Sequence, residues 1–176
     1  MNDVEHRFPV IDLATATPAQ KQIADEIMSG PRKGLFGPFL PLVHAPALAA
    51  KLHKVGEYLR YESTLPKDIL ECAIITVATR WKSPFEWNHH APLALAAGVP
   101  PDVVQAISDN AKTESFPDKY RLIVSLCRDA MNDGRINDHD FAQARSAYGR
   151  EGVLELLTVC GYYSTLAMIL ATADIT

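Results

Sequence analysis

Two acidic residues and one histidine are the side chains in this sequence best suited to chemistry. Glu86 and His90 lie four residues apart within WKSPFEWNHHAPLALAAG (81–98). On a helix this spacing stacks the two side chains on one face, where a carboxylate and an imidazole can exchange a proton. Glu71 stands in the preceding apolar segment, where a buried carboxylate needs a partner. Together the three residues predict a proton-transfer site.

The same stretch also has a purely structural interpretation, which the sequence leaves open. Ser83-Pro84-Phe85-Glu86 matches S-x-x-E, the capping box in which two side chains satisfy free backbone N–H groups at a helix start. Glu86 would then be a cap, and Trp87 would belong to the core. Pro92 favours a functional interpretation, because a proline inside a helix removes a backbone donor and predicts a kink beside the histidines.

Five further residues are candidates for binding a small anionic substrate: Ser83, Arg80, His89, Trp87 and His44. Ser83 begins a helix, where backbone N–H groups favour an anion, and Arg80 is the nearest fixed cation. Trp87, together with Trp81, predicts an apolar wall that raises a carboxyl pKa and lowers an imidazole pKa. Structural alternatives remain, since Arg80 also suits a helix C-terminus and His44 also suits packing or capping.

Helices must position these residues, because period-2 alternation of strand length is nearly missing from the sequence. Proline and capping residues punctuate the chain at intervals typical of helix starts, and glycines follow several expected ends. The expected helices cover about 18–28, 46–61, 66–81, 84–97, 101–108, 117–132, 138–148 and 151–171.

Two segments are unusually apolar for their expected positions. Residues 30–42, GPRKGLFGPFLPL, form a loop too apolar to be a solvated linker, so we expect it to pack over part of the protein. The last helix is apolar nearly all round, which predicts burial between helices or at a subunit contact. Tyr162 and Tyr163 on that helix are expected to be core or interface residues.

Composition narrows the functional classes. The chain has 176 residues, 48% of them hydrophobic, which suits one domain with a substantial core. A net charge of −4 without a basic stripe argues against nucleic acid as a partner. The N-terminus lacks a secretion signal, and the most apolar stretch is shorter than a bilayer span, so we expect a cytoplasmic protein without membrane contact.

Over nearly its whole length the sequence resembles the carboxymuconolactone decarboxylase and alkyl hydroperoxidase D superfamily. The resemblance is carried by the region from LFGPFLPLVHAPAL (35–48) to GVPPDVVQAI (98–107) and by EGVLELLTVCGYYSTLAMILATA (151–173). It implies an all-α, alkyl hydroperoxidase D-like helical bundle in a single domain, residues 18–176, after an N-terminal arm, residues 1–17. It also implies a homo-oligomer, either a trimer or a hexamer.

The redox branch of this superfamily has a glutamate, a cysteine twelve residues later, a second cysteine after three more and a histidine four beyond. Counting from Glu71 places Ser83, Glu86 and His90 at these positions. Both cysteines are absent, so peroxide reduction of the peroxiredoxin type lacks its nucleophile and its resolving thiol. The remaining cysteines, Cys72, Cys127 and Cys160, are expected to be buried free thiols.

A glutamate at the second cysteine position, followed by the histidine, resembles the decarboxylase branch instead. That branch converts 4-carboxymuconolactone to an oxoadipate enol-lactone in aromatic compound catabolism, without a metal or organic cofactor. The resemblance implies a lyase, or a related isomerase or hydrolase, acting on a small carboxylated lactone or cyclic acid through Glu86, His90 and Glu71. No cofactor and no metal are expected, since a second ligand motif for a metal is missing. The alternatives are a non-catalytic oligomeric binding protein and an antioxidant alkyl hydroperoxidase.

Overall fold

The computed structural model describes residues 7–176 and contains helices but no strand in that range. The α-helices are α1 (Pro18–Ser29), α2 (Phe39–Leu42), α3 (Pro46–Glu57), α4 (Lys67–Arg80), α5 (Pro84–Ala96), α6 (Pro101–Ser108), α7 (Asp118–Asp133) and α8 (Asp138–Thr172). A π-helical turn, η1 (Tyr58–Glu62), extends α3, and a 3₁₀ turn, η2 (Thr113–Ser115), precedes α7. The all-α prediction is confirmed. Of the predicted N-terminal arm, residues 1–6 lie outside the described residues.

The predicted helix starts agree with the structure where proline occupies the first turn. This holds for α1, α3, α5 and α6. A complete capping box occurs at α1, where the Thr17 hydroxyl accepts from the Gln20 backbone N–H and the Gln20 side chain bonds back to the cap. The box proposed as the structural alternative for α5 does not form, because the Ser83 side chain makes no cap hydrogen bond. Glu86 is therefore not held by capping.

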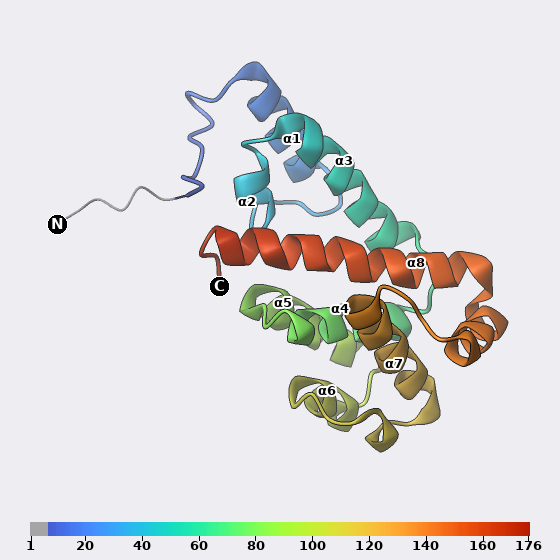
Figure 1. Cartoon of the computed structure of the whole chain (residues 1–176). Helices are drawn as coiled ribbons and strands as arrows, with labels where there is room; N and C mark the ends of the chain where they lie inside the picture. The colour runs from blue at the N-terminus through green and yellow to red at the C-terminus, as the bar shows by residue number, and fades with distance from the viewer. Residues whose placement is uncertain (1–6) are drawn as a thin grey trace.

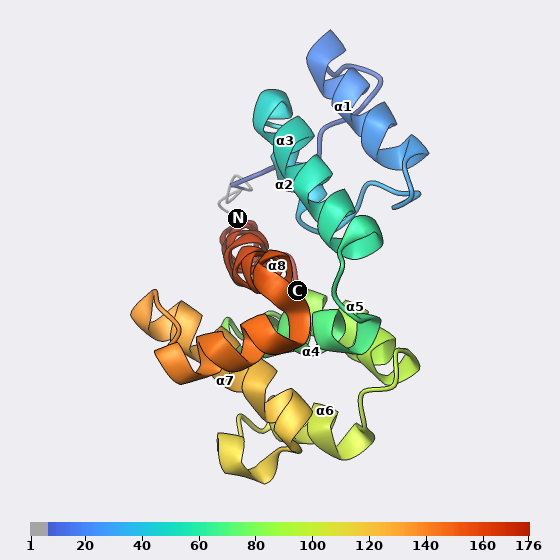
Figure 2. The same ribbon diagram turned by 90° about the vertical axis from the view of Figure 1, so that its right-hand side faces the viewer.

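The helices form two groups on either side of α8 (Figures 1 and 2). The N-terminal helices α1, α2 and α3 lie on one side, and α4, α5, α6 and α7 lie on the other. The apolar loop predicted for residues 30–42 does pack inward, since its last part forms α2 and buries Phe39, Pro41 and Leu42. The chain crosses from one group to the other through η1, so that turn is a junction between them.

Helix α4 is the centre of the second group. Every residue from Ile69 to Ala78 is buried, and α4 packs against α5, α6, α7 and α8. Glu71 is the one charged side chain in that buried run. A carboxylate in such a position is costly without hydrogen-bond partners, so its environment has to supply one.

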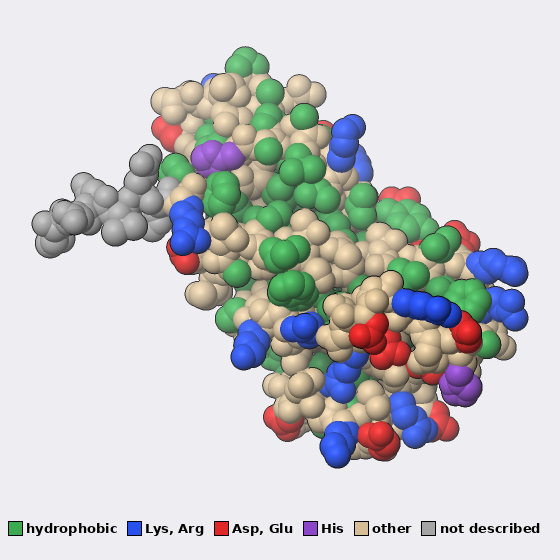
Figure 3. All heavy atoms as spheres, viewed as in Figure 1, with side chains coloured by type: hydrophobic (Ala, Val, Ile, Leu, Met, Phe, Trp, Pro, Cys, Tyr) green, Lys and Arg blue, Asp and Glu red, His purple; other side chains and the backbone are tan. Residues whose placement is uncertain are grey.

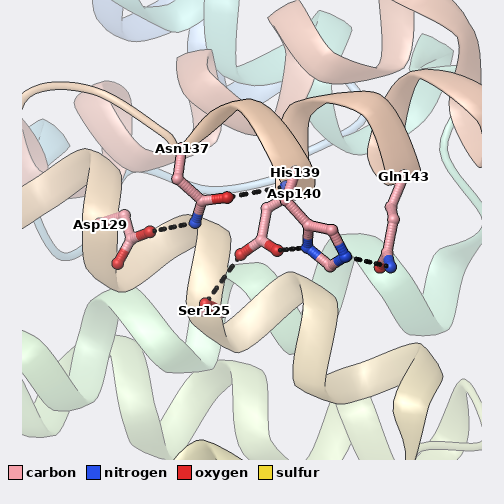
Figure 4. A network of polar contacts seen from close by, with 6 residues as sticks. All are labelled: Ser125, Asp129, Asn137, His139, Asp140 and Gln143. Carbon is pink, nitrogen blue, oxygen red and sulfur yellow. Dashed lines mark hydrogen bonds and ion pairs between the residues drawn. The ribbon is translucent and has the colours of Figure 1, made fainter.

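Helix α8 contains the two helices that the sequence predicts over 138–148 and 151–171. The chain kinks between them at Gly149, whose φ of 70° and ψ of −179° are not helical, and the second helix runs on to Thr172. Its N-terminus is tied to α7 by a polar network (Figure 4): Asn137 accepts from the Asp140 backbone N–H and donates to Asp129, and Ser125 donates to Asp140. These contacts fix how α8 leaves α7.

Among the described residues, α8 is also long and apolar enough to cross a membrane by length and composition alone. Within its most apolar window, 56% of the residues are buried against the rest of the protein. The core helix of a soluble protein has the same pattern, as expected for a helix that lies between two groups of helices.

A buried carboxylate on α8 holds the junction between the two groups. Glu155 accepts hydrogen bonds from the hydroxyls of Tyr58, Ser63 and Thr64 at 2.7, 3.0 and 2.8 Å, and from the Thr64 backbone N–H. Burial raises the pKa of Glu155, but these hydrogen bonds outweigh it, and the net pKa lies below the ordinary 4.5. Glu155 thereby anchors both ends of η1 to α8.

Replacing Glu155 by Gln should lower the free energy of unfolding by about 2 to 4 kcal/mol, because an amide NH₂ group would face hydroxyl and N–H donors. The contribution of Glu155 is present above pH 4.5 and is lost as the pH falls through its lower folded-state pKa. Urea unfolding at pH 7 and pH 3.5 measures both effects. Glu151→Gln, at an exposed position on the same helix, is the control. Equal stabilities for the two variants at pH 7 would contradict this role.

Candidate functional site

The predicted triad of Glu71, Glu86 and His90 comes together between α4 and α5. His90 Nδ1–H donates to Glu71 Oε2 at 2.8 Å, and this hydrogen bond is buried. His90 is 2% exposed and Glu71 is 7% exposed. The hydrogen bond supplies the partner that Glu71 needs within the apolar run of α4. It also fixes the imidazole tautomer, leaving the Nε2 atom of a neutral ring free to accept.

Glu86 lies at the other edge of the same imidazole. Its Oε2 atom is 3.6 Å from His90 Nε2, which is beyond a hydrogen bond but close enough for a short movement to make one. The two residues are one helical turn apart on α5, as their spacing predicts. His90 therefore stands between two carboxylates that occupy opposite edges of its ring.

Burial sets the protonation of this group. It raises the pKa of Glu86 to about 7, although the charges of Arg32 and Arg60 act in the opposite direction. Burial also lowers the pKa of His90, and its hydrogen bond to Glu71 only partly offsets this effect. Near neutral pH the site thus holds a neutral imidazole and a carboxyl group that is protonated about half the time. Such a pair suits general acid–base chemistry at physiological pH.

Aromatic side chains surround the imidazole. The Tyr163 ring from α8 is perpendicular to the His90 ring at a centroid distance of 5.2 Å, and burial raises the pKa of its hydroxyl well above the ordinary value. His89 contacts His90 edge to face at 4.9 Å. Burial and the neighbouring His90 lower the pKa of His89 to about 4, so this ring is also neutral at pH 7.

The loop between α1 and α2 covers the site from the N-terminal group of helices. Phe36 and Arg32 from this loop, together with Arg60 from η1, line a cavity that also contains Glu86 and His90. The loop passes very close to α5 at Gly37, where a Cβ atom would lie 2.3 Å from the Phe85 ring and φ is +57°. Only glycine fits there without strain. The prediction that residues 30–42 pack over part of the protein is confirmed. The region that this loop covers is the candidate site.

The cavity enclosed by these residues is small. Its volume is about 20 Å³, which is room for roughly one water molecule. A substrate larger than that must displace part of the cover, and Phe36, which is 36% exposed, lies at its outer edge. The arrangement described is therefore a closed form of the site.

The predicted substrate-binding residues separate into two sets. His89 lines the cavity. Ser83 and Trp87 instead face a surface depression on the other side of α5, and His44 is exposed, with Nε2 2.8 Å from the Pro9 carbonyl oxygen. Arg80 is also exposed, and its Nε–H donates to Asn132. Neither Arg80 nor His44 is among the residues that line the cavity.

The apolar wall expected from the two tryptophans comes from other residues. Trp81 is 40% exposed, and its indole N–H donates to Ser164 at 2.7 Å. Phe36, Phe39, Phe85 and the tyrosines of α8 line the cavity instead. Tyr162 and Tyr163 are buried, in agreement with the prediction that they are core or interface residues, and they also contact the site, which the sequence does not indicate. Arg32 and Arg60 line the cavity as well. The one sequence signal for these two arginines is their position in or beside segments that are expected to pack on the core.

The cysteines and the acidic side chains bear on two other kinds of site, a thiol-dependent redox site and a metal site. All three cysteines are free and buried, and burial raises the pKa of Cys72 to about 12, which disfavours a reactive thiolate. Within residues 7–176, no group of three or more His, Cys, Asp or Glu side chains is arranged to hold a metal ion.

Comparisons with protein-family models, curated proteins and solved structures found no match to this chain.

The raised pKa of Glu86 makes folding stability depend on pH in a specific way. In the folded state Glu86 binds a proton up to about pH 7, whereas the unfolded carboxyl releases it near 4.5. Stability therefore falls as the pH rises from 4.5 through 7, by at most about 3 kcal/mol. Glu86→Gln removes this effect, so the variant should gain stability relative to the wild type across that interval. Parallel pH profiles of the two proteins in chemical denaturation would contradict a buried, protonated Glu86.

Proposed function

We propose that this protein is a carboxymuconolactone decarboxylase-like, cofactor-independent carboxy-lyase with an alkyl hydroperoxidase D-like helical bundle. Its substrate is a small carboxylated lactone or cyclic acid. The observation that carries the proposal is the buried chain Glu71–His90–Glu86, which combines a fixed imidazole tautomer with a carboxyl group of pKa about 7. The sequence resemblance over residues 35–107 and 151–173 supplies the reaction class.

Decarboxylation of such an acid needs two things from the protein: stabilisation of the enolate that forms, and a proton for the carbon atom afterwards. When the bond between the ring carbon and the carboxylate breaks, CO₂ leaves and the electron pair moves into the conjugated lactone as an enolate. Carbon then takes up a proton. The protonated Glu86 is suited to donate it and becomes a carboxylate, which takes a proton back from solvent when the cover opens. His90 Nε2, 3.6 Å from Glu86 Oε2, is placed to accept that proton and pass it to the carboxylate. Glu71 holds the imidazole in the required tautomer throughout.

The closed cavity supports this assignment. Exclusion of water strengthens the interaction of a developing enolate with nearby donors, and it keeps the proton of Glu86 from exchanging freely. The cover formed by the loop between α1 and α2 then has to open for substrate entry and product release, as loops do in many enzymes.

We also propose that the protein is a cytoplasmic homo-oligomer, a trimer or a hexamer. Hydrophobic side chains gather across the middle of one face, while charged side chains concentrate below them (Figure 3). An apolar groove of about 410 Å³ lies beside α8, and the exposed residues Leu48 and Met168 line it. Surfaces of this kind are commonly covered by a partner.

The direct test is turnover of 4-carboxymuconolactone by the wild type, His90→Gln and Glu86→Gln. We expect each substitution to reduce kcat at least 100-fold, because general acid–base groups contribute about 10²- to 10⁴-fold. Substrate affinity should change far less. His139→Gln, at an exposed histidine outside the cavity, serves as the control and should match the wild type.

Two results would count against the proposal. Normal turnover by both variants would remove the assigned roles of Glu86 and His90. Tight binding of the lactone by the wild type with no turnover at all would favour the non-catalytic binding protein.

A further inference from the structure

The cavity contains polar atoms that no residue of the described chain satisfies. Nε and Nη2 of Arg32 are buried and have no hydrogen-bond partner, and the same is true of the Tyr162 hydroxyl and of His89 Nε2. Arg32 belongs to the loop that covers the site, whereas Tyr162 and His89 come from α8 and α5. Buried polar groups without partners are rare and costly in proteins, so several around one cavity indicate a missing ligand.

Arg32 is held in place by packing rather than by an acidic partner. Its guanidinium carbon lies 4.2 Å from the centroid of the Phe39 ring, in a cation–π contact. None of the ion pairs formed among residues 7–176 includes Arg32 or Arg60. A positioned guanidinium with free N–H groups is the usual protein group for binding a carboxylate through two parallel hydrogen bonds.

A glycine on α3 makes room for this arrangement. A Cβ atom on Gly56 would lie 2.2 Å from the Tyr162 hydroxyl and 3.0 Å from Arg32 Nη2. The Tyr162 hydroxyl and the Arg32 guanidinium therefore both lie against α3 at this glycine. Burial raises the pKa of the hydroxyl, and the guanidinium is close enough for its charge to act in the opposite direction. Any side chain at position 56 would push both of them away, so glycine at this position has a role in shaping the cavity.

We infer that Arg32 binds the carboxylate of the ligand, and that the natural ligand is a planar ring acid whose ring lies among the aromatic side chains of the cavity. This inference rests on the proposed function. It names the residue that binds the carboxylate of the substrate on which His90 and Glu86 are proposed to act. It replaces Arg80, the candidate nearest in sequence, by a residue of the covering loop. Arg32 is part of the loop that covers the site and would also bind the ligand. Ligand binding and closure of that loop are therefore coupled.

The test uses 2-furoate, a planar five-membered ring acid, and its uncharged analogue 2-furamide as probes in calorimetric titrations. The wild type should bind 2-furoate at least 10-fold more tightly than 2-furamide. Arg32→Gln should weaken 2-furoate binding at least 10-fold and leave 2-furamide within 2-fold. Arg32→Lys should not restore full affinity, since an ammonium cannot form the two parallel hydrogen bonds. Arg80→Gln is the matched control and should behave as the wild type.

Substitution of Gly56 provides an independent test of the same binding site. Gly56→Ala should weaken 2-furoate binding, whereas Gly161→Ala, at a helical glycine with no atom within 4 Å of the added Cβ, should not. The melting temperature of ligand-free Arg32→Gln should fall only slightly, because Nε and Nη2 have no hydrogen-bond partner to lose and the contact with the Phe39 ring contributes little to stability. A purely structural role would instead lower the melting temperature strongly and would not separate the affinities for 2-furoate and 2-furamide.

The inference is overturned if the wild type shows no saturable 2-furoate binding, if it binds 2-furamide equally well, or if Arg32→Gln binds 2-furoate as the wild type does. These results are distinct from a failure of the proposed lyase activity. Binding of 2-furoate requires no turnover. Arg32-dependent binding combined with unchanged turnover by His90→Gln would therefore support this inference and contradict only the lyase mechanism.

Discussion

The hydrogen bond between Glu71 and His90 is the interaction on which the rest of the site depends. It joins α4 to α5 inside the core, and it satisfies the one charged side chain in the buried run of α4. Without it a carboxylate would be buried alone, at a cost of several kcal/mol. With it, His90 keeps one tautomer and presents its second nitrogen to Glu86. The same contact thus satisfies a buried carboxylate and leaves the second nitrogen of the ring available for the proton transfer that we propose.

The second constraint is the way the two groups of helices enclose this hydrogen bond. Helix α8 contributes aromatic rings from one direction, and the loop between α1 and α2 closes the site from another. Glu155 fastens η1 to α8, so the turn that carries Arg60 has a fixed position at the junction. Burial then shifts the pKa of Glu86 upward to about 7 and the pKa of His90 downward, so the ring is neutral at pH 7 and the carboxyl group exchanges between its protonated and ionised forms.

Local sequence signals predicted the helices and the grouping of Glu71, Glu86 and His90, because both depend on spacing along one or two neighbouring helices. The four-residue interval between Glu86 and His90 indicates that both lie on the same face of a helix. The apolar surroundings of Glu71 indicate a buried carboxylate that requires a hydrogen-bond partner. Proline at the first turn marked the starts of α3 and α5. Arg32, Arg60 and most of the aromatic wall escaped prediction, because they come from the loop between α1 and α2, from η1 and from α8, whose approach to the site only tertiary packing determines. Nearness in sequence favoured Arg80 and Trp81, which the fold turns toward other contacts.

The protonation state of His90 tests the central claim most directly. Two-bond ¹H–¹⁵N correlation spectra of the protein labelled with ¹⁵N-histidine, with the signals of His90 assigned through His90→Gln, report which ring nitrogen carries hydrogen. We predict a neutral ring at pH 7 with the proton on Nδ1 and a bare Nε2, as the hydrogen bond to Glu71 requires. A doubly protonated ring at pH 7, or a proton on Nε2 alone, would contradict the account.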